Sequence, residues 1–335
     1  MYVVPENLRL RPARMEDAGA VFELKCQNAI LLTGQTDESM EDMLKDWEDP
    51  EVSLESDLRV VENLQGEIIG FAEFFPQKPP VTMWLDIYVR RDYESSGISE
   101  VMAEWIEGRA HETIDQAPAG ARVALRAYTY QEDERYYQPL LERIGLQRIR
   151  HSYRMKIDLD TPPRVPVIPA GFTIRNAISN QDERNVRMAV RESFKDHFGH
   201  VERDFDEDFQ QWMHYWQDYD PSLWWLAFSG DELAGICLCE PKFADDDSMG
   251  WVGTLGVKRE YRKHGLGRAL LLTAFHEMYQ RGKKGVGLGV DASSLTGAVA
   301  LYEQAGMYVA QRFDLYEKEL RAGVDMTTHE LETAG

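Results

Sequence analysis

Cysteine is scarce in this sequence, which has only Cys26, Cys237 and Cys239 in 335 residues. An odd number of widely separated cysteines argues against a disulfide framework as the basis of the fold. Cys237 and Cys239 lack a second pair of ligands at the spacing of a zinc site. Because side chains alternate along a strand, we expect these two thiols on one face of a strand, and we expect no metal site.

Basic residues and long apolar runs are also lacking. Lys and Arg number 37 against 58 Asp and Glu, which gives a formal net charge of -21 at pH 7. Such a field repels nucleic acid and anionic membranes, keeps a protein in solution and suits a cationic substrate. No apolar run approaches a membrane span, and Met1–Glu6 does not resemble a signal peptide. These absences predict a cytoplasmic protein with no nucleic-acid or membrane partner.

What the sequence does contain is an internal repeat. Leu10 corresponds to Ile174, Val89 to Val257 and Gly145 to Gly306, at offsets that stay between about 160 and 170 residues. A period of this length is that of a domain, so the chain is a tandem duplication. We expect a first domain at 1–160 and a second at 171–321.

Two shorter segments complete this division. Four prolines crowd into 161–170, and because proline lacks a backbone donor this segment is predicted to be an extended linker. The last segment, 322–335, has little apolar content and is expected to be a flexible tail.

Hydrophobic periodicity in the second copy predicts an α+β (mixed α/β) fold. Apolar runs at 223–228, 233–240 and 249–257 indicate strands, and the stripe from Leu266 to Met278 indicates an amphipathic helix against a sheet. A further strand at 285–290, a helix at 297–304 and a final hairpin or pair of strands at 307–320 follow. Each domain is therefore expected to have a mostly antiparallel central sheet flanked by helices.

The loop Arg262-Lys263-His264-Gly265-Leu266-Gly267 lies between the strand at 249–257 and that helix. Its glycines allow close approach of the backbone, and the free N–H groups and dipole of the helix start suit a pyrophosphate. A P-loop would need lysine and a hydroxyl residue after Gly267, where Arg268 and Ala269 stand. A dinucleotide fingerprint would need a small residue where Leu270 stands.

This loop resembles the pyrophosphate loop of the GNAT superfamily of N-acetyltransferases. The segment Ala300-Leu301-Tyr302-Glu303-Gln304-Ala305-Gly306-Met307 resembles a second signature of that family. The resemblance implies an acetyl-CoA-dependent N-acetyltransferase in which Tyr302 protonates the departing thiolate. The family often has asparagine where Leu295 stands, and Ser294 or Thr296 could supply that contact. The cofactor-binding residues implied are Leu255, Val257, Arg262, Lys263, His264, Gly265, Leu266, Gly267 and Arg268.

The general base is less well marked. Glu240 ends one strand and is our choice, and Asp291, at the end of another, is the alternative; both are also ordinary strand-end carboxylates. His197 and His200 could line the acceptor side. A group of tryptophans could wall the acceptor pocket or form core: Trp212, Trp216, Trp224 and Trp225. Since the implied transfer is direct, the cysteines have no required role.

The first copy lacks this chemistry. Glu94 and Ser95 replace the two basic residues of the loop, Ser99 replaces its second glycine, and Leu141 replaces the tyrosine. We therefore expect a non-catalytic first domain, an organisation that resembles tandem GNAT enzymes such as the mycothiol synthases.

The function that this resemblance implies is acetyl transfer from acetyl-CoA to the primary amine of a small metabolite in a ternary complex. Two alternatives stay open: a protein N-terminal or lysine acetyltransferase, and a non-enzymatic acyl-CoA sensor. The tandem arrangement is compatible with either a monomer or a homodimer.

Overall fold

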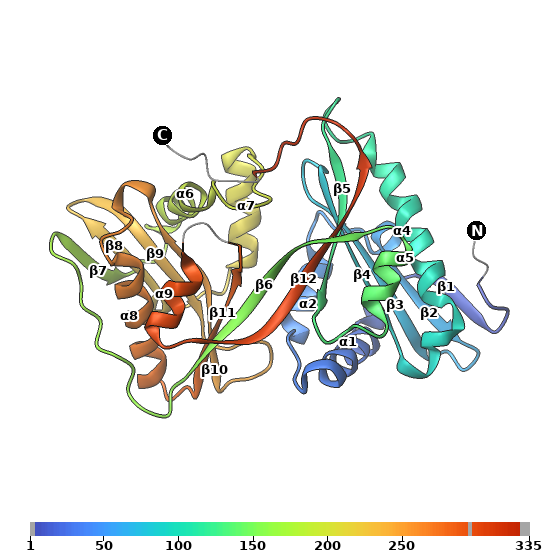
Figure 1. Cartoon of the computed structure of the whole chain (residues 1–335), viewed down its shortest axis with the longest axis horizontal. Coiled ribbons are helices and arrows are strands. Elements are labelled where there is room, and N and C mark those ends of the chain that lie inside the picture. The colour runs from blue at the N-terminus through green and yellow to red at the C-terminus, as the bar shows by residue number, and fades with distance from the viewer. Residues whose placement is uncertain (1–3, 294–296, 329–335) are drawn as a thin grey trace. The chain divides into compact units, whose positions relative to one another are not determined.

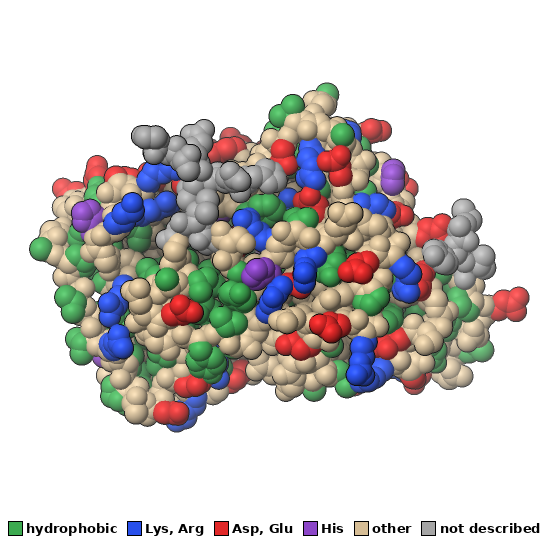
Figure 2. All heavy atoms as spheres, in the orientation of Figure 1, with side chains coloured by type: hydrophobic (Ala, Val, Ile, Leu, Met, Phe, Trp, Pro, Cys, Tyr) green, Lys and Arg blue, Asp and Glu red, His purple; other side chains and the backbone are tan. Residues whose placement is uncertain are grey.

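The computed structural model describes residues 4–293 and 297–328. Contacts divide the chain into two compact units (Figure 1). Unit 1 comprises Met1–His151 and Phe313–Met326, and unit 2 comprises Ser152–Arg312 and Thr327–Gly335. Unit 1 therefore contains a segment, Phe313–Met326, that follows the main part of unit 2 in the sequence. On the face shown in Figure 2, acidic and basic side chains are interspersed, so the acidic excess does not gather into one patch there.

Unit 1 is built on a sheet with the order β1-β2-β3-β4-β5-β12. Its strands are β1 (Leu8–Pro12), β2 (Leu58–Asn63), β3 (Ile68–Pro76), β4 (Thr82–Val89), β5 (Val123–Tyr130) and the Phe313–Arg321 part of β12 (Tyr308–Arg321). Its helices are α1 (Ala18–Thr33), α2 (Met40–Glu48), α3 (Leu54–Asp57), α4 (Ile98–Ile114) and α5 (Tyr137–Arg143). Neighbouring strands are antiparallel except β4 and β5, which are parallel.

Unit 2 repeats this plan with the order β6-β11-β10-β9-β8-β7. Its strands are the Ser152–Asp158 part of β6 (Gln147–Asp158), β7 (Phe172–Asn176), β8 (Trp224–Ser229), β9 (Glu232–Glu240), β10 (Met249–Val257) and β11 (Gly285–Asp291). Its helices are α6 (Glu183–Phe194), α7 (Phe205–Tyr215), α8 (Leu266–Gln280) and α9 (Ala298–Ala305). The mixed, mostly antiparallel sheet predicted from the sequence is confirmed, with β10 and β11 as the parallel pair.

The core of unit 2 lies between α8 and the sheet. Leu266, Leu270, Ala274 and Met278 of α8 are buried against Val286 and Leu288 of β11 and their neighbours. This is the apolar stripe expected from the helical spacing. Burying these side chains fixes the face of α8 and therefore the direction in which its N-terminus points.

One element differs from the sequence analysis. Instead of a hairpin at 307–320, the chain forms a single 14-residue strand, β12. The segment from Tyr308 to Arg321 contains no glycine, proline or asparagine, so it lacks the residues that favour a tight turn. From Phe313 onward this strand pairs with β5 of unit 1.

The segment 161–169 is irregular, as its prolines predict. Residues 322–328 form backbone hydrogen bonds: Val324 pairs with Gly120 and Arg122, and Thr328 with Gly199 and His200. The remainder of the predicted tail, 329–335, lies outside the described residues. Within the described part of the chain, no helix has both the length and the apolar character needed to cross a membrane.

Candidate functional site

Strand β10 separates from its parallel neighbour in the middle of the sheet of unit 2. It pairs with β11 only from Met249 to Val252. Beyond this point β10 stays paired with β9 as far as Val257, while β11 stays paired with β6 as far as Asp291. The register of β10 against β9 shifts after Val252, which makes Gly253 a bulge. The described strands thus leave the 254–257 edge of β10 open toward β11.

The predicted pantetheine residues Leu255 and Val257 lie on this open edge. An unpaired edge presents backbone N–H and C=O groups to an extended ligand, as in strand addition. The geometry therefore suits a chain carrying amide groups.

The turn before α8 places the start of that helix at the end of β10. Gly265 is the N-cap and has φ 81° and ψ 5°, a left-handed conformation that glycine adopts without strain. Lys263 also has a positive φ of 67°. The N–H groups of the first turn have no partner within the helix, so α8 offers an anion site at its N-terminus.

Gly267 has a packing role in this turn. A Cβ added there would lie 3.4 Å from Cδ1 of Leu301 in α9. That distance is close to ordinary van der Waals contact, so α9 packs on the first turn of α8, and the two helices lie side by side in Figure 1. The helix that carries Tyr302 therefore lies against the helix start that forms the predicted anion site.

Arg262 is engaged by the protein itself. Its guanidinium donates to the carbonyl oxygens of Val257 at 3.1 Å and Ser193 at 2.9 Å, and it lies 3.5 Å from Asp196. These contacts tie the loop to the end of β10 and to the C-terminal end of α6. The side chain therefore braces the loop, and its role toward a ligand stays a prediction.

Lys263, His264 and Arg268 are the other polar side chains predicted for this site. Lys263 and His264 are exposed, and the described residues provide no ion-pair partner for Lys263. Nε of Arg268 is buried without a hydrogen-bond partner in the described residues. Lys263 and Arg268 are thus the cations of the loop that remain available to an anion.

Tyr302 lies in α9 and is 8% exposed. Its side chain belongs to the same core cluster as Leu266 and Cys237. Burial, with a smaller contribution from the nearby Cys237 thiol, raises the pKa of Tyr302 well above its usual value. The phenol is therefore protonated at neutral pH and can serve as an acid. Residues 294–296, including Leu295 and its neighbours Ser294 and Thr296, lie outside the described residues.

Glu240 lies over the bulge in β10. A Cβ added at Gly253 would be 2.9 Å from Oε1 of Glu240, and the ring of Trp216 lies beside the same glycine. The glycine therefore makes room for this carboxylate next to the open edge. Asp291 ends β11 on the other side of the opening and accepts the backbone N–H of Ser293 at 2.8 Å.

His197 and His200 lie in the segment after α6. Burial, followed by the charge of Arg262, lowers the pKa of His197, and its ring packs on Phe194 with centroids 4.4 Å apart. Nε2 of His200 lies 3.4 Å from Glu202. The neighbourhood of His197 also includes Asp291, so this segment lies on the side of the open edge.

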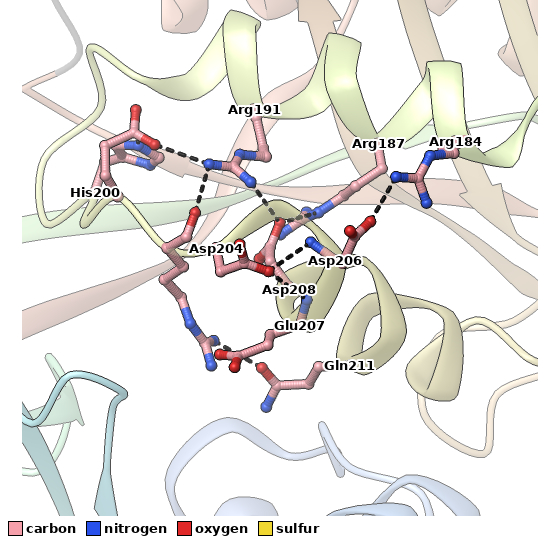
Figure 3. A network of polar contacts seen from close by, with 11 residues as sticks. Arg184, Arg187, Arg191, His200, Asp204, Asp206, Glu207, Asp208 and Gln211 are labelled. Atoms are coloured by element: carbon pink, nitrogen blue, oxygen red, sulfur yellow. Dashed lines mark hydrogen bonds and ion pairs between the residues drawn. The ribbon is translucent and has the colours of Figure 1, made fainter.

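An ionic network joins α6 to α7 beneath this segment (Figure 3). Arg187 makes two hydrogen bonds to Asp208, and Arg191 bonds Glu202 at 2.9 Å and lies 3.7 Å from Asp208. Arg184 forms a more exposed pair with Asp206. This network was not predicted from the sequence, although the spacing of three and four residues between the arginines of α6 indicates that they share one face of the helix.

The remaining candidates belong to the core. Cys237 and Cys239 lie on one face of β9 with sulfur atoms 3.7 Å apart, which confirms the alternation expected. The hydrogen bond between the two thiols, together with burial, raises the pKa of Cys239, so that thiol is not activated. Trp212 of α7, Trp216 at the C-terminal end of that helix and Trp224 of β8 pack together. Trp225 packs on the core beneath α8. Among the described residues, no cluster of three or more His, Cys, Asp or Glu could hold a metal ion.

The corresponding turn in unit 1 keeps the backbone but not the charges. Gly97, the N-cap of α4, has φ 81° and ψ 4°, close to the values of Gly265. Ser99 is buried in the first turn, and Leu141 is buried where Tyr302 stands in unit 2. A helix start of the same shape has thus lost its basic residues and its tyrosine.

These features define the class of protein. The acetyltransferase (GNAT) family model matches residues 24–128 and 187–307, and the chain belongs to this family. It is an N-acetyltransferase enzyme with two GNAT domains, and enzymes of this family use acyl-CoA.

Individual relatives refine this assignment. The mycothiol acetyltransferase of Streptomyces scabiei is 25% identical over 257 residues, which cover 76% of this chain and 77% of that protein. That of Thermobispora bispora is 30% identical over 248 residues, covering 72% and 76%.

Solved structures agree with this pattern. A GCN5-related N-acetyltransferase from Sphaerobacter thermophilus has a TM-score of 0.79 and 32% identity, and the match covers 96% of this chain and 99% of that one. A tandem GNAT protein from the clavulanic acid biosynthesis pathway has a TM-score of 0.69 at 16% identity, covering 93% and 98%, and it supports the fold alone.

Proposed function

We propose that unit 2 transfers an acetyl group from acetyl-CoA to the primary amine of a small molecule, by direct attack in a ternary complex. The observation that supports this most strongly is the combination of the open edge of β10 with the N-terminus of α8 and with Tyr302. Together they provide an amide-binding edge, an anion site and a protonated phenol in one unit.

The residues of unit 2 fit this donor. First-turn N–H groups of α8, with Lys263 and Arg268, would hold the pyrophosphate, and the edge at Leu255 and Val257 would hold the pantetheine arm. The donor supplies an electrophilic thioester carbonyl. The loop brace formed by Arg262 keeps the anion site and the strand edge in a fixed relation.

Proton transfer falls to two side chains in this proposal. Glu240 takes a proton from the acceptor ammonium, directly or through water, and the free amine then attacks the carbonyl carbon. A backbone N–H at the end of β10 stabilises the charge that develops on the carbonyl oxygen. The C–S bond breaks, the Tyr302 hydroxyl gives its proton to the thiolate, and the surplus proton of the attacking nitrogen passes to the Tyr302 phenolate, directly or through water. Asp291 is the alternative base.

The acceptor class rests on the relatives. They are mycothiol acetyltransferases, which favours a small molecule over a peptide as the acceptor. A protein N-terminal or lysine acetyltransferase is the second candidate. Membership in a family of enzymes weighs against the acyl-CoA sensor. A screen of small amines and short peptides by thiol release from acetyl-CoA distinguishes the two acceptor classes.

Gly265→Val tests the donor site, and Gly97→Val is its matched control. Both glycines have the same left-handed conformation, and an added Cβ meets nothing within 4 Å at either one. Each substitution should therefore cost a similar amount, about 1–2 kcal/mol of stability. Acetyl-CoA should raise the melting temperature of the native protein and of Gly97→Val but not of Gly265→Val. An undiminished shift in Gly265→Val would contradict the site assignment.

A further inference from the structure

Unit 1 contains a cavity at the place where its own parallel strands separate. β4 and β5 pair only from Thr82 to Trp84 on β4, as β10 and β11 do over a short stretch in unit 2. Beyond that point lies a cavity of about 350 Å³, a size that suits a small ligand. Its walls come from α1, α2, β3, β4, β5, the segment before α5 and Phe313 of β12. The acetyl-transfer site proposed above lies in unit 2 and does not use it.

The cavity is strongly acidic. Six carboxyl groups and a single lysine line it: Asp37, Glu38, Asp46, Glu73, Asp86, Asp133 and Lys25. Glu73 and Asp86 are direct cross-strand partners on β3 and β4, an arrangement that like charges disfavour. Burial, followed by the charge of Glu73, raises the pKa of Asp86 to about 8. Burial likewise raises the pKa of Asp46 to about 7. A core built for stability alone would avoid this concentration of negative charge.

Buried polar atoms of three cavity-lining residues, Glu38, Tyr136 and Tyr137, lack hydrogen-bond partners among the described residues. Tyr137, the first residue of α5, is 7% exposed and lines the cavity. The Ile87 backbone lies near its hydroxyl, yet the oxygen makes no hydrogen bond within the described part of the chain. Oε2 of Glu38 is also buried with no such partner among the described residues. Buried polar atoms are normally hydrogen-bonded, so these atoms leave room for a ligand that carries donors.

Lys25 shows how this cavity holds a cation. Its ammonium group lies 2.7 Å from Oε1 of Glu38 and 3.9 Å from Glu73, and it lies over the ring of Tyr88 at 5.3 Å from the centroid. Carboxylates together with an aromatic face are the surroundings that ammonium groups favour. Tyr88 corresponds to Gly256 of unit 2 when the repeats are aligned on Val89 and Val257, so the aromatic wall is particular to unit 1. One ammonium against six carboxyl groups leaves an excess of negative charge.

We propose that this cavity binds a small organic cation that carries one or more ammonium groups. The described residues contain no metal-binding cluster, and this favours an organic cation over a metal ion. Water could fill a polar cavity, but water would not neutralise the charge of the facing carboxyl groups. An ammonium donor can bond both Glu38 and the Tyr137 hydroxyl while it compensates the Glu73–Asp86 pair.

Isothermal titration of the full chain with putrescine, without acetyl-CoA, tests this proposal. We expect one putrescine per chain, with 1-aminobutane binding more weakly and neutral 1-butanol not binding. Asp86→Asn and Glu38→Gln should each weaken putrescine binding by at least about tenfold. Because the ammonium displaces protons from cavity carboxyl groups at neutral pH, the measured heat should also vary with the ionisation enthalpy of the buffer.

Three controls make the result specific to this cavity. Asp115→Asn removes an exposed carboxyl of the same unit and should leave binding unchanged, as should Glu240→Gln and Gly265→Val in unit 2. Absence of binding by both amines at millimolar concentration would overturn the proposal. So would equal weakening by Asp115→Asn and Asp86→Asn, or loss of binding in Glu240→Gln with Asp86→Asn unaffected. Since binding is measured without the acyl donor, failure here leaves the acetyltransferase proposal untouched, and the reverse also holds.

Discussion

Two buried tyrosines, Tyr302 in unit 2 and Tyr137 in unit 1, illustrate how single side chains differ between the copies. Each lies in the helix that follows the parallel strand pair, and burial raises the pKa of each well above the ordinary tyrosine value. Tyr302 lies in α9, which packs on the first turn of α8. Tyr137 lines the acidic cavity. The same residue type is thus suited to donate a proton in one unit and a hydrogen bond in the other.

Replacing Tyr302 by phenylalanine should slow acetyl transfer and leave donor binding nearly intact. A general acid typically contributes 10²–10⁴-fold, so we expect kcat to fall by at least about 10²-fold in Tyr302→Phe. Tyr308→Phe is the control, since it removes an exposed hydroxyl that bonds Asp158 at 3.0 Å. Steady-state kinetics and calorimetric titration with acetyl-CoA give the two quantities. An unchanged kcat would assign the acid role to water or another group.

Asp86 should make stability depend on pH. Its pKa is raised to about 8 in the folded chain, so this carboxyl keeps a proton that the unfolded chain releases above about pH 4. Stability from this group is therefore present at low pH and is lost as pH rises from about 4 to 8. The charges that act on it are those of Glu73 on β3, Lys25 on α1, and Glu38 and Asp37 before α2. The same cavity is also lined by Asp46 of α2, Tyr88 of β4, Tyr137 of α5 and Asp133.

Thermal unfolding of Asp86→Asn across pH measures this effect. Above about pH 8 and without a bound cation, the variant should melt higher than the native chain, and below about pH 5 the advantage should disappear. Asp115→Asn should show no such trend. If the native chain melts at a higher temperature than Asp86→Asn both below pH 5 and above pH 8, ionising Asp86 does not destabilise the folded chain.

The sequence predicted Tyr302 as a site residue but did not predict the acidic cavity, for a physical reason. Tyr302 belongs to a contiguous motif, whereas the cavity residues are scattered from Lys25 to Phe313 and meet only in the fold. The alternation of β4 gave no warning that Asp86 would face Glu73, because pairing partners depend on register. The contacts of Arg262 were hidden as well, since Ser193 lies 69 residues away.

At the scale of elements, the bulge at Gly253 and the short β10–β11 pairing decide where the site lies. The sequence predicted both strands and the mostly antiparallel sheet but not the point at which the strands separate. Helix α6 packs on β10 beside this opening. A Cβ added at Gly256 would lie 2.9 Å from Cβ of Ser193, so the helix is in direct contact with the strand. Gly253 therefore lies where the two strands separate, and Gly256 allows α6 to pack closely beside the opening.

The α6–α7 network should stabilise this wall through its buried member. Arg187 and Asp208 have side chains that are 17% and 9% exposed, against 56% and 69% for Arg184 and Asp206. Arg187→Ala removes two hydrogen bonds from the largely buried carboxylate of Asp208 and should lower the free energy of unfolding by about 1–3 kcal/mol. Arg184→Ala should cost less than about 1 kcal/mol. Chemical denaturation gives both values, and equal costs would show that burial does not govern this network (Figure 3).

At the scale of the whole molecule, each sheet is completed by a strand from the other half of the sequence. β5 of unit 1 pairs with Phe313–Arg321, and β11 of unit 2 pairs with Ser152–Asp158. The repeat in the sequence predicted two domains. An alignment of the two copies cannot show that the last strand of one copy pairs within the sheet of the other. The absence of glycine, proline and asparagine between residues 308 and 321 was the signal in the sequence that this segment is one long strand.

Cutting the chain within 161–170 should therefore leave the two pieces associated. A protease site inserted there should give fragments that elute together in size exclusion under native conditions and separate in denaturant. Residues 1–151 alone should aggregate, because the β5 edge is then unpaired. The same fragment joined by a flexible linker to residues 313–326 should remain in solution and unfold cooperatively. Independent elution of the two cleaved pieces would contradict the exchange.

Strand exchange also determines when each unit can fold during synthesis on the ribosome. The sheet of unit 1 cannot be completed when residues 1–151 have been synthesised, because its last strand begins only at Phe313. At about 5–20 residues per second, this wait is on the order of ten seconds or more. During that interval the β5 edge of the nascent chain is unpaired. A ribosome-associated chaperone that covers this edge should therefore reduce aggregation most after residue 151 has been synthesised, and slow translation beyond that point should increase it.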